Sequence, residues 1–252
     1  MQAGGIGHES NQAASDDAAY LFREVISNVP LSAEGDDDGL YITCVEYWDG
    51  NLYIGTSGAE LLHFVSLPAE EGSESDQPTF ILASRLEPPF TTKSDSPYHT
   101  PGVQQILILP SVSKACILCN GTLTFYTLPE LSPAFRAIKQ PDCAWIGGLD
   151  RDLEDEDDNS NDTVALLLLK QRLRLIRIGD QARKVRDIEL PGCVNVERRG
   201  DLACVADGKA YSLLDVVNQQ KIDLFPISTA VEAPDRSVSP AEDAKPSSAR
   251  QP

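Results

Sequence analysis

Three short turn sequences, each an Asn or Asp followed by Gly, constrain the fold of this chain more than any other feature. Asp49-Gly50, Asn120-Gly121 and Asp207-Gly208 each lie between two segments rich in Val, Ile, Leu, Thr and Tyr. Tight hairpin turns require positive φ angles, which Gly, Asn and Asp adopt most readily. No apolar stripe at helical spacing competes with these segments between residues 40 and 227. The chain is therefore predicted to be all-β.

The strand segments group into four units, each with an incoming strand, a central hairpin and an outer strand. The units begin near residues 41, 105, 143 and 193, about 50 residues apart on average, which is typical of β-propeller blades. The expected strands are 41–47, 52–56, 60–67 and 80–86; 105–109, 114–119, 122–128 and 135–138; 143–149, 163–169, 172–178 and 184–189; and 194–198, 202–206, 209–216 and 221–224. This pattern favours a β-propeller over a sandwich. Four blades can close a ring, but no closing strand follows the fourth unit, so we expect the first part of a larger propeller.

Composition separates this core from the two ends of the chain. Residues 1–39 are mostly small and polar, apart from an amphipathic stretch at 20–31 that could form a short helix. Residues 229–252 are rich in Pro and Ser and cannot bury enough apolar surface to offset the entropy of ordering. We therefore expect a disordered segment at 1–39, propeller blades at 40–228 and a disordered linker at 229–252.

The charge balance narrows the possible partners and the compartment. The 252 residues include 21 basic and 39 acidic side chains, for a formal net charge of −18, which disfavours a nucleic-acid partner. The longest aliphatic run, 164–169, is far shorter than the roughly 20 residues of a membrane-spanning helix. The first ten residues lack the regions of a secretory signal, and the six cysteines sit mostly in apolar segments. The sequence therefore predicts a cytoplasmic protein.

Residues able to support catalysis or bind a metal are scarce. Cys116 and Cys119 form a CxxC pair, but residues three apart in a strand point to opposite faces, so these cysteines are predicted to be structural. The three histidines are distributed over a terminal segment, a strand and a loop, as His8, His63 and His99. Neither a zinc ligand set nor a catalytic pair follows from these positions. We expect no catalytic residue, cofactor or metal.

Charge is distributed unevenly around the third unit. Residues 150–158 contain seven acids and one Arg, whereas residues 170–186 contain seven basic residues and one acid. Blocks of like charge are usually solvated, which is the simpler interpretation. The alternative is a docking patch for an acidic partner or an anionic lipid, and its candidate residues are Arg172, Arg174, Arg183, Lys184 and Arg186. Arg172 and Arg174 share a strand face, and Arg177 does not.

Five segments resemble, in order and spacing, the citron homology domain, and within that group the vacuolar protein sorting-associated protein 3 family. They are residues 43–67 (TCVEYWDGNLYIGTSGAELLHFVSL), 80–90 (FILASRLEPPF), 102–135 (GVQQILILPSVSKACILCNGTLTFYTLPELSPAF), 143–150 (CAWIGGLD) and 202–216 (LACVADGKAYSLLDV). The resemblance covers about residues 20–228. It implies a seven-bladed propeller followed in full-length members by an α-solenoid, without catalytic residues. It also implies a CORVET tethering subunit that engages a Rab-family small GTPase and other tethering-complex subunits, peripherally on endosomal or vacuolar membranes.

Two other functions are compatible with the same residues. One is a citron homology module of a signalling or cytoskeletal regulator that binds a small GTPase. The other is a propeller enzyme, which would need inward-facing acids, histidines or a metal cluster, whereas the acids here lie in loops. An incomplete propeller would also leave unpaired strand edges. We therefore expect the 252-residue chain to self-associate or to require further blades for stability.

Overall fold

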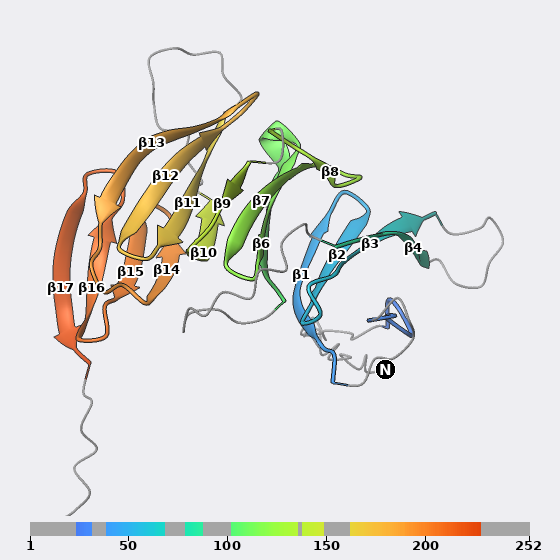
Figure 1. Ribbon diagram of the computed structural model, residues 1–252, viewed down its shortest axis with the longest axis horizontal. Coiled ribbons are helices and arrows are strands. Elements are labelled where there is room, and N and C mark those ends of the chain that lie inside the picture. Colours follow the sequence, from blue (N-terminus) through green and yellow to red (C-terminus); the bar gives the residue numbers. More distant parts are fainter. Residues whose placement is uncertain are drawn as a thin grey trace, which may run out of the picture.

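The chain forms a row of four antiparallel β-sheets (Figure 1). The computed structural model describes residues 24–31, 39–68, 79–87, 102–135, 138–148 and 162–227. Within these ranges the regular structure is all strand except for one short 3₁₀ turn, η1 (Pro110–Val112). Each sheet is a meander in chain order, as in a propeller blade, so the predicted all-β, propeller-type fold is confirmed.

We number the blades one to four along the chain. The first contains β1 (Ile42–Trp48), β2 (Asn51–Thr56), β3 (Leu61–Leu67) and β4 (Thr79–Leu86); the second contains β5 (Val103–Leu109), β6 (Lys114–Cys119), β7 (Thr122–Thr127), β8 (Ser132–Pro133) and β9 (Lys139–Gln140). The third contains β10 (Cys143–Gly148), β11 (Thr163–Leu169), β12 (Arg172–Ile178) and β13 (Ala182–Glu189); the fourth contains β14 (Asn195–Arg199), β15 (Leu202–Ala206), β16 (Ala210–Asp215) and β17 (Gln220–Pro226). The first strands of successive blades lie next to one another, which lines the blades up about a common edge.

The turn sequences adopt the geometry that their residues favour. Asn120 and Gly121 have φ angles of 48° and 69°, and Asp49 and Gly50 have φ angles of 46° and 76°. At the third turn, the Asp207 carboxylate accepts hydrogen bonds from the next two backbone N–H groups along the chain after Gly208, each at 2.9 Å. The local chemistry of these residues therefore sets the three hairpins.

The outer strand of the second blade differs from the prediction. A single strand was expected at 135–138, but β7 pairs instead with two two-residue strands, β8 and β9. Pro133 has no N–H for a longer ladder, and Leu131 and Phe135 turn the chain at φ angles of 58° and 52°. The Phe135 ring packs edge-on against Phe125, with ring centroids 5.4 Å apart. The outer edge of this blade is therefore built from two short pieces.

Apolar side chains fill the spaces between neighbouring blades. One cluster joins the first and second blades around Tyr53 and Ile117, and another joins the second and third around Phe125 and Leu167. A further cluster joins the third and fourth blades around Leu175. Three apolar layers thus lie between the sheets, and each inner blade contributes to two of them.

The segment 24–31 lies on the outer face of the first blade. Ile26 and Val29 pack against Ile54 and neighbouring apolar residues, and the Arg85 guanidinium donates a hydrogen bond of 2.7 Å to the Pro30 carbonyl oxygen. No helical turn forms in this segment, so the possible short helix at 20–31 is absent from its described part. Apolar packing and this hydrogen bond join the segment to the first blade. Three other parts of the sequence lie outside the described residues. They are residues 1–23 and 32–38, the acidic block at 150–158 and the expected linker at 229–252.

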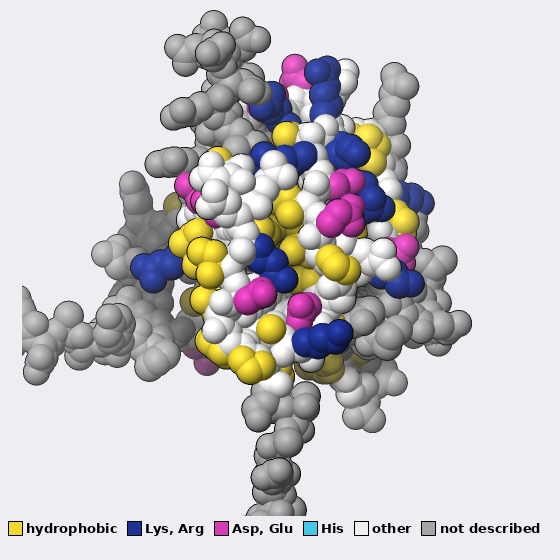
Figure 2. Space-filling view, turned by 90° about the vertical axis from the view of Figure 1, so that its left-hand side faces the viewer, with side chains coloured by type: hydrophobic (Ala, Val, Ile, Leu, Met, Phe, Trp, Pro, Cys, Tyr) yellow, Lys and Arg dark blue, Asp and Glu magenta, His cyan; other side chains and the backbone are white. Residues whose placement is uncertain are grey.

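The far face of the fourth blade carries exposed apolar side chains. Cross-strand partners share a face, which places Cys204, Leu213 and Ile222 together, beside Tyr211 and Phe225. Ile222 and Phe225 are 60% and 57% exposed. Figure 2 looks onto this end of the row, where hydrophobic side chains lie among charged ones. In the three preceding blades the corresponding face is covered by the next blade.

We predict that the 252-residue chain self-associates through this face, because an apolar sheet surface of this kind gains stability when covered. The double substitution Ile222→Asp and Phe225→Asp should shift sedimentation velocity profiles to the monomer. The matched control is Ile81→Asp, an isoleucine 46% exposed in the first blade, which should leave the profile unchanged. Wild-type chain that sediments as a monomer at all concentrations would contradict the prediction.

Candidate functional site

The β12–β13 hairpin carries all five basic residues that the sequence nominated for a docking patch, but it divides them between two faces. Lys184 pairs with Ile176, whose side chain packs toward the second blade, and Arg174 and Arg172 lie on the same face. Arg186 pairs with Leu175, whose side chain packs toward the fourth blade, and Arg183 also lies on that side. The expected single patch is therefore two separate groups of charges.

A β-bulge determines which residues share the face toward the second blade. The register shifts between Leu175 and Ile176, where Arg186 and Lys184 are the successive partners and Val185 has none. The extra residue places Lys184 on the same face as Asp187, three positions later, which strict alternation would not do. The sequence alone does not reveal this bulge.

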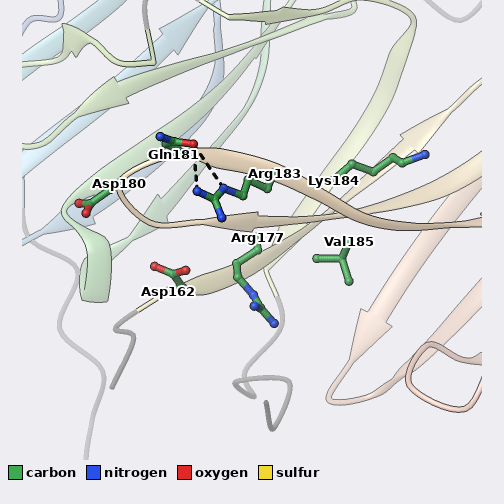
Figure 3. Close-up of a pocket in the computed structure, with 7 residues that line it drawn as sticks. All are labelled: Asp162, Arg177, Asp180, Gln181, Arg183, Lys184 and Val185. Carbon is green, nitrogen blue, oxygen red and sulfur yellow. Dashed lines mark hydrogen bonds between the residues drawn. The ribbon is translucent and has the colours of Figure 1, made fainter. Parts of the chain in front are cut away.

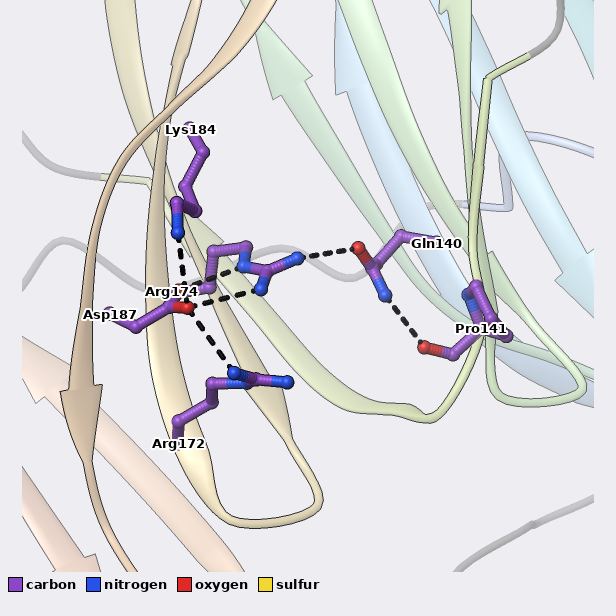
Figure 4. Close-up of polar contacts among 6 residues, drawn as sticks. All are labelled: Gln140, Pro141, Arg172, Arg174, Lys184 and Asp187. Atoms are coloured by element: carbon purple, nitrogen blue, oxygen red, sulfur yellow. Dashed lines mark hydrogen bonds and ion pairs between the residues drawn. The ribbon is translucent and has the colours of Figure 1, made fainter.

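Three cations converge on the Asp187 carboxylate (Figure 4). The Arg174 guanidinium donates two hydrogen bonds to it, from Nε at 2.8 Å and from Nη2 at 3.1 Å. Arg172 Nη1 lies 3.4 Å and Lys184 Nζ 3.6 Å from carboxylate oxygen Oδ2. We call these four residues the Asp187 cluster. The basic stretch noted in the sequence, residues 170–186, ended one residue before Asp187, the carboxylate with which the three cations pair.

The Asp187 cluster also connects the second and third blades. Arg174 Nη1 donates a 3.0 Å hydrogen bond to the Gln140 side-chain oxygen, and Gln140 donates in turn to the Pro141 carbonyl oxygen. The hydrogen bonds from Arg174 hold the pKa of Asp187 below its usual range, and the same contact raises the pKa of Arg174. Both groups are therefore charged at neutral pH.

Arg186 and Arg183 have different surroundings on the other face. Arg186 Nη2 donates hydrogen bonds to the carbonyl oxygens of Val216 and Val217, at 2.7 and 3.0 Å, and so joins the third blade to the fourth. Arg183 Nε and Nη2 contact the Gln181 side-chain oxygen at 3.3 and 3.1 Å. Arg186 has a structural role, whereas Arg183 lies at an open surface.

That surface is a hollow of about 570 Å³ at the tip of the hairpin (Figure 3). Its lining residues are Asp162, Arg177, Asp180, Gln181, Arg183, Lys184 and Val185. The Lys184 side chain points away from the two arginines in this view. The lining of the hollow therefore holds three basic residues and two aspartates, and the two arginines lie on the same side as the aspartates.

The cysteines and His63 lie in apolar or hydrogen-bonded surroundings. Cys116 belongs to the cluster between the second and third blades and Cys119 to the cluster between the first and second, so the two sulfurs lie on opposite faces, as predicted. Burial raises the pKa of Cys119 and of Cys143 to about 12. His63 is 4% exposed, stacks on Tyr53 and lies 2.8 Å from the Asn51 side-chain oxygen.

Among the described residues, the charge state of His63 and the grouping of the possible metal ligands indicate the roles of these side chains. Burial lowers the pKa of His63, which favours the neutral ring. No group of three or more His, Cys, Asp or Glu residues that could hold a metal ion occurs in the described ranges. His8 and His99 lie outside those ranges. The strand geometry therefore supports structural roles for Cys116, Cys119 and His63.

Comparison with known proteins places this architecture in a family. The model of the VPS3 N-terminal domain matches residues 38–240, a span that contains every strand of the four blades. The chain belongs to the VPS3 N-terminal domain family. It is 30% identical over 114 residues to vacuolar protein sorting-associated protein 3 of Saccharomyces cerevisiae, which covers 45% of this chain and 9% of that protein. It is 24% identical over 209 residues to transforming growth factor-beta receptor-associated protein 1 of Mus musculus. That match covers 79% of this chain and 22% of the mouse protein.

The VPS3 N-terminal domain described here spans at most about a fifth of the length of these relatives. Among solved structures, the AfRom2 CNH domain is similar with a TM-score of 0.44 and 12% identity, over 73% of this chain and 54% of that one. In the part of the chain that the structure describes, no helix is long and apolar enough to cross a membrane.

We predict that Asp187→Asn destabilises the fold at neutral pH by about 1 to 2 kcal/mol, because three cations lose their shared counter-charge. The folded-state pKa of Asp187 is depressed. Its stabilising effect is therefore complete above the unfolded value of about 3.9 and is lost as the pH falls through the folded value. Urea unfolding should be measured at a series of pH values. The difference in free energy of unfolding between wild type and variant should narrow as the pH falls below about 3.9. The control is Asp142→Asn, an exposed carboxyl on the β9–β10 turn, and equal costs for the two variants would refute the prediction.

We predict that Cys204, which is half-buried, reacts with a maleimide before the buried cysteines. Cys116, Cys119 and Cys143 should stay unmodified in the native chain, because burial raises the pKa of each thiol and blocks access to it. Mass spectrometry of the chain labelled before and after urea unfolding provides the measurement. Formation of a disulfide between Cys116 and Cys119 under mild oxidation would show that the opposite-face assignment is wrong.

Proposed function

We propose that this chain is a non-catalytic protein-interaction module of a CORVET-type vesicle-tethering subunit in endosome-to-vacuole transport. The observation that carries the proposal is the family match over residues 38–240, which spans all four blades. The relatives' names support the sorting role, since one is a vacuolar protein sorting protein.

The proposed partners are a Rab-family small GTPase and other subunits of the tethering complex. We propose a cytoplasmic chain that associates peripherally with endosomal or vacuolar membranes through these partners. A net charge of −18 opposes direct adsorption to anionic lipid, which favours recruitment by protein contacts. The same charge disfavours nucleic acid as a partner.

The surroundings of the potentially reactive side chains support a non-catalytic role. The described histidine is buried and hydrogen-bonded, and burial raises the pKa of Cys116, Cys119 and Cys143. Catalytic nucleophiles and bases require the opposite conditions, with a lowered thiol pKa or an accessible base. We propose no cofactor for the same reason.

We predict that the immobilised 252-residue chain retains at least one endosomal Rab GTPase loaded with a non-hydrolysable GTP analogue, and retains the GDP-loaded form weakly. Rab and Rho GTPases from the same organism should be measured in parallel by biolayer interferometry. Retention of Rho GTPases instead would favour the signalling-regulator alternative. If neither class binds and the chain fails to co-purify with tethering-complex subunits, the proposal is wrong.

A further inference from the structure

The Asp187 cluster has more positive charge than its own carboxylate neutralises. Arg174 already occupies both carboxylate oxygens at 2.8 and 3.1 Å, whereas Arg172 and Lys184 lie farther away at 3.4 and 3.6 Å. The side chains of Arg172 and Lys184 are 45% and 58% exposed, while that of Arg174 is 19% exposed. Arg172 and Lys184 can therefore turn toward a further anion while Arg174 holds Asp187 in place.

An open groove of about 550 Å³ begins at this cluster and runs between the β9–β10 turn and the β11–β12 hairpin. Gln140 and Arg172 belong both to the groove and to the contacts of the cluster. Lys170 adds another basic residue to the lining, beside Leu169 and Pro141. The groove lining itself holds two basic and two acidic residues, so the positive charge at this site comes from the adjoining cluster, where Arg174 and Lys184 add to Arg172.

We propose that this groove and the Asp187 cluster form a docking site for an acidic segment of a partner protein. Carboxylate side chains of that segment would contact Arg172 and Lys184, and its backbone would lie along the groove past Gln140. This site rests on the proposed function of the chain as an interaction module, and it identifies the chemistry that the partner would present. Charge complementarity supplies the specificity and the rate of association.

The surroundings favour a protein segment over a membrane surface. Asp142 and Glu189 lie in the groove among the basic residues, so the lining has mixed charge. Anionic membranes are recognised by clusters of Lys and Arg that face the lipid together. A concave lining with alternating charges fits a flexible peptide whose side chains can adapt to it.

The test uses a fluorescent peptide of alternating Glu and Ser, with a Gln and Ser peptide of the same length as the neutral control. Fluorescence anisotropy with the 252-residue chain should show binding of the acidic peptide only, weakened by salt. Arg172→Glu with Lys184→Glu should weaken that binding roughly tenfold or more. The matched control, Arg183→Glu with Lys209→Glu, changes the net charge equally at other exposed positions and should leave binding within about twofold.

Several outcomes would overturn the proposal. The first is no binding of the acidic peptide, and the second is an equal loss of binding in the two double variants. The third comes from a parallel measurement with phosphatidylserine vesicles, in which the Arg172→Glu with Lys184→Glu variant loses vesicle binding but still binds the peptide. If the charge reversal prevents folding, the double variant Arg172→Gln with Lys184→Gln replaces it. This variant should also bind the acidic peptide more weakly than wild type, with a smaller loss of affinity. The peptide assay needs no GTPase, so a chain that binds no Rab protein can still pass it, and the two proposals fail separately.

Discussion

The whole structure depends on sheets that are apolar on both faces. In β11, alternate residues of one aliphatic run enter different clusters: Leu166 and Leu168 pack toward the fourth blade, whereas Leu167 and Leu169 pack toward the second. A sheet in a sandwich needs only one such face. A sheet with two apolar faces needs a neighbour on each side, which extends the array blade after blade.

This requirement explains the difference between the two ends of the row. On the first blade, the segment 24–31 covers part of the apolar outer face with Ile26 and Val29. On the fourth blade, Ile222 and Phe225 remain exposed within the described residues. Polar contacts between blades lie where the apolar layers end, as with Arg174 on one side of the third blade and Arg186 on the other. Burial thus determines which blades meet, and the arginines fix how their outer edges align.

Sequence reasoning predicted the parts of the fold that local chemistry determines. The Asn-Gly and Asp-Gly turns fixed the hairpins, and alternating or continuous apolar runs located most strands to within about two residues. The outer strand of the second blade was misplaced because its pairing depends on Pro133 and on two residues with positive φ. The short helix that the sequence allowed over 20–31 does not form in its described part, where Ile26 and Val29 pack on the first blade instead.

The site was predictable as a list of charges but not as an arrangement. Strand alternation correctly placed Arg172 and Arg174 together, but the bulge at Val185 moved Lys184 to their face, and the register separated Arg183 and Arg186 from them. Asp187 and Gln140 come from different blades, and no spacing in the sequence indicates that Arg174 bridges them. Because Arg174 contacts both, the separation of the second and third blades sets the geometry of the cluster. The position of Arg172 at the groove, and of Lys184 beside Asp187, therefore follows from the same apolar layer that joins those two blades.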